Sequence, residues 1–216
     1  MLKLTVLGAD SVLAADTCAA CPHSPAGCCV APPRYDWTDL GRVVAHGGHA
    51  WLLEQIRAGA LRRVEHGYAI RRDKTRLSAD RGAPRLAKCT FHAGDRGCTI
   101  ETWQRPATCN FYLCESALED AVREGQHAEA ARAKHVHDAL VSWFVAADRA
   151  IADEARARVL GSTPAQSEAA GSLLARVLGS TRAPRSAAGS LLAQEDVSEL
   201  LRWLGQRFAE RAQPTD

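Results

Sequence analysis

The cysteines constrain this chain more than any other feature. Its 216 residues include eight cysteines, and these fall in two short blocks. The first block, CAACPHSPAGCCV at residues 18–30, holds Cys18, Cys21, Cys28 and Cys29; the second holds Cys89, Cys98, Cys109 and Cys114. The spacing is C-x2-C-x6-C-C, a gap of 59 residues, and then C-x8-C-x10-C-x4-C. If all eight thiols contribute to one site, the fold must bring these two distant segments together.

The expected compartment decides what such thiols do. Residues 1–17 begin with an apolar run, but Asp10 interrupts it and Asp16 stands where a signal peptide needs small residues. No stretch approaches the roughly 18 uninterrupted apolar residues of a membrane span. We therefore expect a cytoplasmic protein with no membrane partner. In a reducing compartment, clustered thiols serve more often as metal ligands or redox groups than as structural disulfides.

The number of thiols favours metal binding over dithiol redox chemistry. The spacing Cys18-x2-Cys21 lets two sulfurs reach one ion, although the same spacing also serves redox enzymes. A redox site needs two thiols, whereas a zinc ion or an iron–sulfur cluster takes four. Eight thiols could make two such sites, or one site with thiols to spare. Because neighbours in an extended chain point to opposite faces, we expect Cys28 and Cys29 to serve two centres, or one of them to pack.

The whole pattern resembles a known family. The order CxxC, CC, C, C-x-I, RP, C, C is similar to that of the YkgJ-like cysteine-cluster family, described as zinc- or iron-chelating domain proteins. The resemblance covers about residues 18–115 and implies a metal-binding or iron–sulfur protein. A lysine N-methylase of flagellin carries a related signature. The residues that carry the resemblance are Cys18, Cys21, Cys28, Cys29, Cys89, Cys98, Ile100, Arg105, Pro106, Cys109 and Cys114.

All eight cysteines are therefore predicted metal ligands, and other residues are predicted to support them. Four thiolates around Zn²⁺ leave a net charge of about −2, which needs nearby donors and a cation. Arg105 suits that role, with Lys88 and Arg96 as further candidates. Pro106 is expected to fix the turn that returns Cys109 to the site. A turn at residues 94–97 is expected to form a hairpin that joins Cys89 and Cys98. Two histidines inside the blocks rank below every cysteine as ligands: His23 and His92.

Periodic apolar positions predict a mainly α (α+β) fold. A helix is expected from Asp36, with Asp36 or Thr38 as its cap and a break at residues 47–48. Two apolar stripes recur at helical spacing after residue 116. They comprise Val136, Leu140, Trp143, Phe144, Ala147 and Ile151, and Val197, Leu200, Leu201, Leu204 and Phe208. We predict a cysteine-rich loop and hairpin module in residues 1–115 and a helical C-terminal region in residues 116–216.

The C-terminal region contains a tandem repeat. LGSTPAQSEAAGSLLARV at 160–177 is followed by LGSTRAPRSAAGSLLAQE at 178–195, with 12 of 18 positions identical. Two copies are fewer than a solenoid needs. We interpret the repeat as a duplication that lengthens a linker or helical hairpin; the alternative is a partner-binding segment presented twice.

A basic segment leaves a second question open. Residues 57–88 contain ten Lys and Arg against three acidic residues, a local net charge of +7 in a chain of net charge +2. We favour a solvated linker, and the alternative is a docking surface for an acidic protein or nucleic acid.

Three function classes follow from these patterns. The first is a cysteine-ligated metal-binding protein, with zinc or an iron–sulfur cluster, in a structural, metal-handling or electron-transfer role. The second is a cluster-dependent methyl-transfer or redox enzyme, although the sequence has no phosphate-binding glycine loop. The third is a zinc module that binds nucleic acid. We favour the first.

Overall fold

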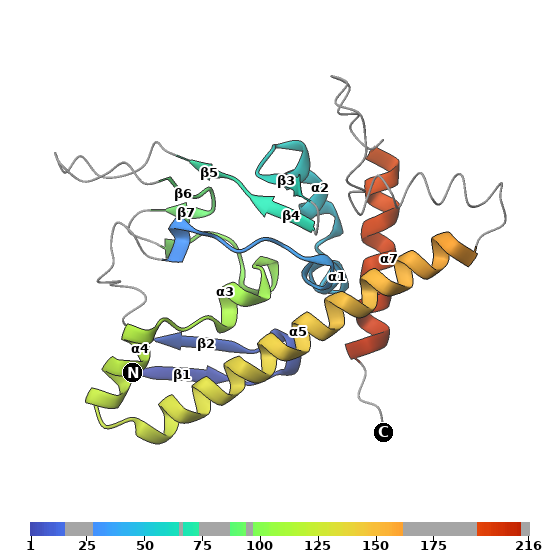
Figure 1. The fold of residues 1–216 in the computed structure, drawn as a ribbon. Coiled ribbons are helices and arrows are strands. Elements are labelled where there is room, and N and C mark those ends of the chain that lie inside the picture. Colours follow the sequence, from blue (N-terminus) through green and yellow to red (C-terminus); the bar gives the residue numbers. More distant parts are fainter. Residues whose placement is uncertain (16–27, 65–66, 74–86, 94–96, 162–193, 213–216) are drawn as a thin grey trace. The chain divides into compact units, whose positions relative to one another are not determined.

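The fold is that of a computed structural model, which describes residues 1–15, 28–64, 67–73, 87–93, 97–161 and 194–212. Helices dominate these residues and small two-stranded antiparallel sheets accompany them, which confirms the predicted mainly α (α+β) class (Figure 1). The chain forms two compact units built from alternating segments. Unit 1 comprises residues 1–33 and 70–144, and unit 2 comprises residues 34–69 and 145–216. All the described cysteines lie in unit 1.

Unit 1 begins with an antiparallel pair of strands, β1 (Leu2–Thr5) and β2 (Val12–Ala15). Leu2 pairs with Ala15 and Leu4 pairs with Leu13, so these apolar residues share one face of the pair. The 3₁₀ turn η1 (Gly8–Asp10) connects the strands. Ser11 closes this turn, because its hydroxyl accepts from the Leu7 amide at 2.9 Å and donates to the Gly8 carbonyl at 2.6 Å.

Helices cover the apolar face of this strand pair. They are α3 (Ala107–Phe111), α4 (Glu115–Arg123) and the first part of α5 (His127–Gly161). The amide of Leu2 donates to the Gln126 side chain at 3.2 Å, which ties β1 to the start of α5. The core that results is rich in alanine: Leu2, Leu13, Ala15, Ala107, Phe111, Leu113, Ala117, Ala121, Ala130, Ala133, Leu140 and Phe144.

The cysteine-bearing part of unit 1 consists of very short elements. Most of the cysteines lie on η3 (Cys28–Val30), β6 (Lys88–Cys89), β8 (Gly97–Cys98) and α3. Strand β5 (Arg72–Asp73) pairs with β6, and β7 (His92–Ala93) pairs with β8. The 3₁₀ turn η4 (Thr102–Gln104) then leads into α3. Each of these four strands has two residues, so backbone ladders contribute little to holding this region together.

Unit 2 begins with the predicted broken helix. Helix α1 (Trp37–Ala45) starts at Asp36, whose side chain accepts from the Asp39 amide at 2.8 Å. Gly47 has a φ of +84°, which favours glycine, and α2 (His49–Arg57) follows. Both the cap at Asp36 and the break at residues 47–48 are confirmed. Strands β3 (Leu61–Val64) and β4 (Gly67–Ile70) pair with each other beyond α2.

Two glycines let α1 and the C-terminal helix α7 (Gln194–Ala212) pack closely. A Cβ atom at Gly41 would lie 2.6 Å from the Leu204 carbonyl oxygen, and a Cβ at Gly205 would overlap the Val44 side chain. Only glycine permits this separation of the two helix axes. The apolar stripe of α7 is buried as predicted, at Val197, Leu200, Leu201, Leu204 and Phe208.

The stripe on α5 is confirmed with one exception. Leu140, Phe144, Ala147 and Ile151 are buried and Val136 is half-buried against the core, but Trp143 is 37% exposed, so its assignment to the buried stripe is wrong. Trp143 instead packs its ring edge-on against Phe144, with the centroids 4.9 Å apart. The tandem repeat at 160–195 lies almost wholly outside the described residues. Among the helices that the structure describes, none combines the length and apolar character of a membrane span.

Candidate metal centre

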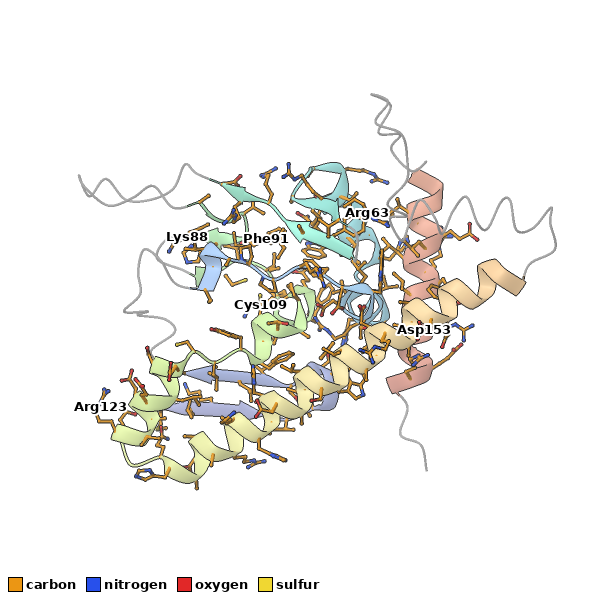
Figure 2. All side chains as sticks on the ribbon, in the orientation of Figure 1. Arg63, Lys88, Phe91, Cys109, Arg123 and Asp153 are labelled. Carbon is orange, nitrogen blue, oxygen red and sulfur yellow. The ribbon has the colours of Figure 1, made fainter. Side chains whose placement is uncertain are left out.

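Three segments of unit 1 bring cysteines into one neighbourhood. Turn η3 packs against β6, which places Cys28 and Cys29 beside the segment that carries Cys89. The thiols of Cys89 and Cys109 are both close enough to Cys29 to affect its ionisation. Figure 2 shows Lys88, Phe91 and Cys109, which come from β6, the segment after it and α3. Residues from both cysteine blocks of the sequence therefore meet.

The link between η3 and β5 is an arginine that the sequence analysis did not single out. Arg72 stands opposite Cys89 in the β5–β6 pair, and its guanidinium donates to the Val30 carbonyl at 3.0 Å. This contact joins residues 42 positions apart and holds the adjacent cysteines next to β6. Nothing in the sequence distinguishes Arg72 from its basic neighbours, so this contact could not be predicted from the sequence.

The adjacent cysteines are arranged differently from the prediction. We expected Cys28 and Cys29 on opposite faces of an extended chain, but the segment is a 3₁₀ turn and their thiols are hydrogen-bonded to each other. In a 3₁₀ turn consecutive side chains are separated by about 120° rather than 180°, which permits this contact. The expectation of opposite faces is therefore wrong.

The pKa values of Cys28 and Cys29 are shifted in opposite directions. The hydrogen bond from the Cys29 thiol, supported by the charge of Lys88, lowers the pKa of Cys28 to about 6 against the opposing effect of burial. The same hydrogen bond, together with burial and the negative charge of Cys28, raises the pKa of Cys29. Cys28 is therefore the thiolate at neutral pH, and Cys29 is the donor that stabilises it.

This arrangement predicts where the chain reacts with an alkylating reagent. In protein stripped of metal with a chelator, we expect iodoacetamide labelling of Cys28 to show a pH midpoint near 6, because only the thiolate reacts. In Cys29→Ala the stabilising donor is gone and the midpoint should move toward the ordinary thiol value. Peptide mapping by mass spectrometry locates the label and follows its rate. A midpoint near 8.5 in both proteins would contradict the hydrogen-bonded pair.

The predicted hairpin is present, with a different pairing. Strands β7 and β8 are antiparallel and flank the expected turn, and the residue opposite Cys98 is His92 rather than Cys89. Cys89 still lies close to Cys98, whose charge adds to the effect of burial in raising the pKa of Cys89 to about 11. Burial, assisted by Lys88, lowers the pKa of His92. The hairpin therefore gathers two thiols and one imidazole.

Arg105 and Pro106 lie beside the segments that carry Cys98 and Cys109. The Nε of Arg105 donates to the Ile100 carbonyl at 3.1 Å, and the Cys98 thiol reaches the same carbonyl at 3.9 Å. Pro106 is the residue before α3, and its carbonyl accepts from the Cys109 amide at 2.9 Å. Arg105 thus stands near Cys98, and Pro106 starts the helix that carries Cys109.

The remaining residues predicted to bind or support the metal divide into two groups. Cys114 precedes α4 and packs against the alanine-rich core of unit 1. Cys18, Cys21, His23 and Arg96 lie outside the described residues. The structure thus describes six of the eight cysteines, and these six form no disulfide with one another.

The donor types fit a thiophilic ion, but their positions do not yet form a ligand sphere. Within the described ranges, no three Cys, His, Asp or Glu side chains are placed so that they could hold one metal ion. Since thiolates prefer Zn²⁺ and iron–sulfur clusters, the chemistry of the set is suitable.

The basic segment 57–88 is largely engaged in contacts of its own unit where it is described. Arg63 stacks over Trp37 at 5.0 Å and over Tyr68 at 5.8 Å within unit 2. In unit 1, Arg71 pairs with Asp73 at 3.0 Å. Residues 74–86 lie outside the described part of the chain. These contacts use arginines that a docking surface would need.

Comparison with known proteins yields no match: no family model fits the chain, and neither the curated proteins nor the solved structures contain a significantly similar one.

Proposed function

We propose that unit 1 is a cysteine-ligated metal-binding module whose ion joins the two cysteine blocks. The observation that carries the proposal is the position of Cys29, which has Cys28 as its hydrogen-bonded neighbour and the thiols of Cys89 and Cys109 nearby. These residues come from three segments that span 82 positions of the chain. Thiols from distant segments that meet without forming disulfides suit a thiophilic ion.

The surroundings provide the positive charge that such a site needs. Lys88 acts on Cys28, and Arg105 shares the Ile100 carbonyl with Cys98. Several thiolates in one place repel one another, and neighbouring cations reduce that cost. Cys28 favours its thiolate form at neutral pH, so most molecules need not release a proton from Cys28 when the ion binds.

The proposed role is structural. The short strands β5 to β8 provide few backbone hydrogen bonds, so side-chain contacts and the ion would hold this region. A bound ion would supply cross-links between the segments, and its binding energy would then contribute to folding. Cys18, Cys21 and Cys98 are further proposed ligands. We leave Cys114 outside the set, because it packs against the core at the start of α4.

The test is elemental analysis of anaerobically prepared protein in matched variants. We expect stoichiometric zinc in colourless protein, or iron with broad visible absorbance. Cys29→Ser should lose at least about tenfold in metal affinity and unfold at a lower temperature, because a central ligand is removed. Cys114→Ser should keep the metal content of the parent chain.

The outcomes separate the alternatives. Metal-free parent protein, prepared with zinc and iron available, would refute the proposal. Equal metal content in the parent chain and Cys29→Ser would show that Cys29 is not a ligand. The proposal would then lose the observation that carries it. Loss of metal in Cys114→Ser alone would move the centre toward α4.

A further inference from the structure

Three carboxylates meet at the start of α1 in unit 2, a unit that contains none of the described cysteines. Asp36 precedes the helix, Asp39 lies in its first turn and Asp148 comes from α5. We call Asp36, Asp39 and Asp148 the α1 carboxylate cluster. Asp39 is 3% exposed and Asp36 and Asp148 are half-buried, so water screens the cluster poorly.

Two of the carboxylates accept hydrogen bonds from first-turn amides that have no acceptor within the helix. Asp36 accepts from the Asp39 amide at 2.8 Å. Asp148 accepts from the amides of Trp37 at 2.9 Å and Thr38 at 3.4 Å. The Asp148 contacts join elements 111 and 110 positions apart in the chain. They attach α5 to the first turn of α1.

Three arginines lie around the cluster, in different degrees of burial. Arg42 is fully buried, with its Nε 3.8 Å from Asp39 Oδ1. The helix N-terminus adds about half an elementary charge. Arg34 also acts on Asp36, but it is exposed, so water weakens its contribution. Arg63 faces Trp37, with its guanidinium 5.0 Å from the ring centroid. Because Asp36, Asp39 and Asp148 lie together and are buried or half-buried, ionisation of all three carboxyls is costly.

We propose that the α1 carboxylate cluster retains a proton in the folded protein and that this proton stabilises the attachment of α5 to α1. Asp36 is the group that carries it, because its carboxyl can be neutral while one oxygen still accepts from the Asp39 amide. With Asp36 neutral, the charges on Asp39 and Asp148 are matched more closely by Arg42 and the helix N-terminus. Unit 2 thus contains a contact whose strength depends on pH near neutrality.

The ionisation of Asp36 is consistent with this assignment. Burial, followed by the charges of Asp39 and Asp148, raises the pKa of Asp36 to about 8. When the contact opens, the carboxyl returns to its ordinary pKa near 3.9. Between these two values the open state loses its proton and the closed state keeps it. The contact therefore weakens as pH rises from about 4 to about 8 and changes no further above that.

The experiment is hydrogen exchange on the full chain, comparing the parent with Asp36→Asn and Asp148→Asn. Asparagine keeps the oxygen that accepts the amide hydrogen bond but carries no charge. After correction for intrinsic exchange, protection of the Trp37 and Thr38 amides in the parent should fall at least about tenfold between pH 5 and pH 8, as a pKa difference of one unit or more requires. In Asp36→Asn this pH dependence should disappear, and in Asp148→Asn it should shrink.

Asp153→Asn is the matched control, because Asp153 lies on the exposed face of the same helix α5 (Figure 2). It should retain the pH dependence of the parent. Carbon-13 NMR of the aspartate carboxyls gives a second measurement, in which one aspartate titrates above pH 6.5 and is absent from Asp36→Asn. Equal pH dependence in the parent and Asp36→Asn, or titration of every aspartate below pH 5, would overturn the proposal.

Discussion

Replacing Arg42 with methionine is expected to destabilise unit 2 by about 3–5 kcal/mol. The Arg42 side chain is 0% exposed and that of Asp39 is 4% exposed, and Arg42 Nε lies 3.8 Å from Asp39 Oδ1. Methionine fills a similar volume but leaves the Asp39 carboxylate buried beside Asp36 and Asp148 without its guanidinium neighbour. Urea unfolding followed by circular dichroism measures the loss in free energy.

Two further variants separate the charge effect from packing. Arg42→Met combined with Asp39→Asn removes both charges and should recover at least about half of the lost stability. Arg123→Met breaks the exposed pair between Arg123 and Asp120, at 2.6 Å, and should cost less than about 1 kcal/mol. If the double variant were no more stable than Arg42→Met, packing rather than charge would explain the loss.

Gly41→Ala is expected to destabilise unit 2 by about 1–3 kcal/mol, although alanine normally stabilises a helix interior relative to glycine by about 1 kcal/mol. The sign reverses because the new methyl group would lie 2.6 Å from the backbone oxygen of Leu204, which cannot move without α7. Gly205→Ala should cost less, since its methyl group meets the side chain of Val44 instead of backbone.

A control on the same pair of helices tests this explanation. Ala209 lies on the exposed face of α7, so Ala209→Val adds two methyl groups without meeting α1 and should change stability by about 0.5 kcal/mol or less. Urea unfolding again gives the comparison. A more stable Gly41→Ala protein would mean that the two helices separate at little cost and that the close packing contributes no stability.

Local features of this fold were predictable from the sequence because their causes are local. Asp36 as a cap and the glycines at 47–48 act within one turn of the chain, and both are confirmed. The apolar stripe of α7 follows from the period of the helix. The β7–β8 hairpin follows from the turn residues between two short strand-forming runs.

Features that depend on distant partners were not predictable. Arg42 looks like an ordinary surface arginine, and only the packing of unit 2 buries it. The contact from Asp148 to α1 and the contact from Arg72 to Val30 leave no periodic signal. The 3₁₀ conformation of Cys28–Val30 brings together two side chains that were expected on opposite faces. Of the candidate site, the sequence therefore predicted residue types and blocks, but not which thiols are neighbours.

The division of the chain into compact units was also not predictable from the sequence. The sequence favoured two consecutive regions, 1–115 and 116–216, because the cysteines end and the helical pattern begins between them. The compact units instead alternate along the chain, and one boundary falls inside helix α5. Composition changes along a chain do not report which segments pack together.

The packing of α1 against α7 also has a consequence for synthesis of the protein. More than 140 residues separate the end of α1 from the start of α7, so a ribosome adding about 5–20 residues per second makes the two helices roughly 7–30 seconds apart. During that interval Leu40 and Val43, which the complete fold buries fully, lack the helix that covers α1. The nascent chain therefore exposes an apolar, aggregation-prone surface until translation is nearly finished. The yield of folded protein in a cell then depends on how well that surface is kept from aggregating during translation.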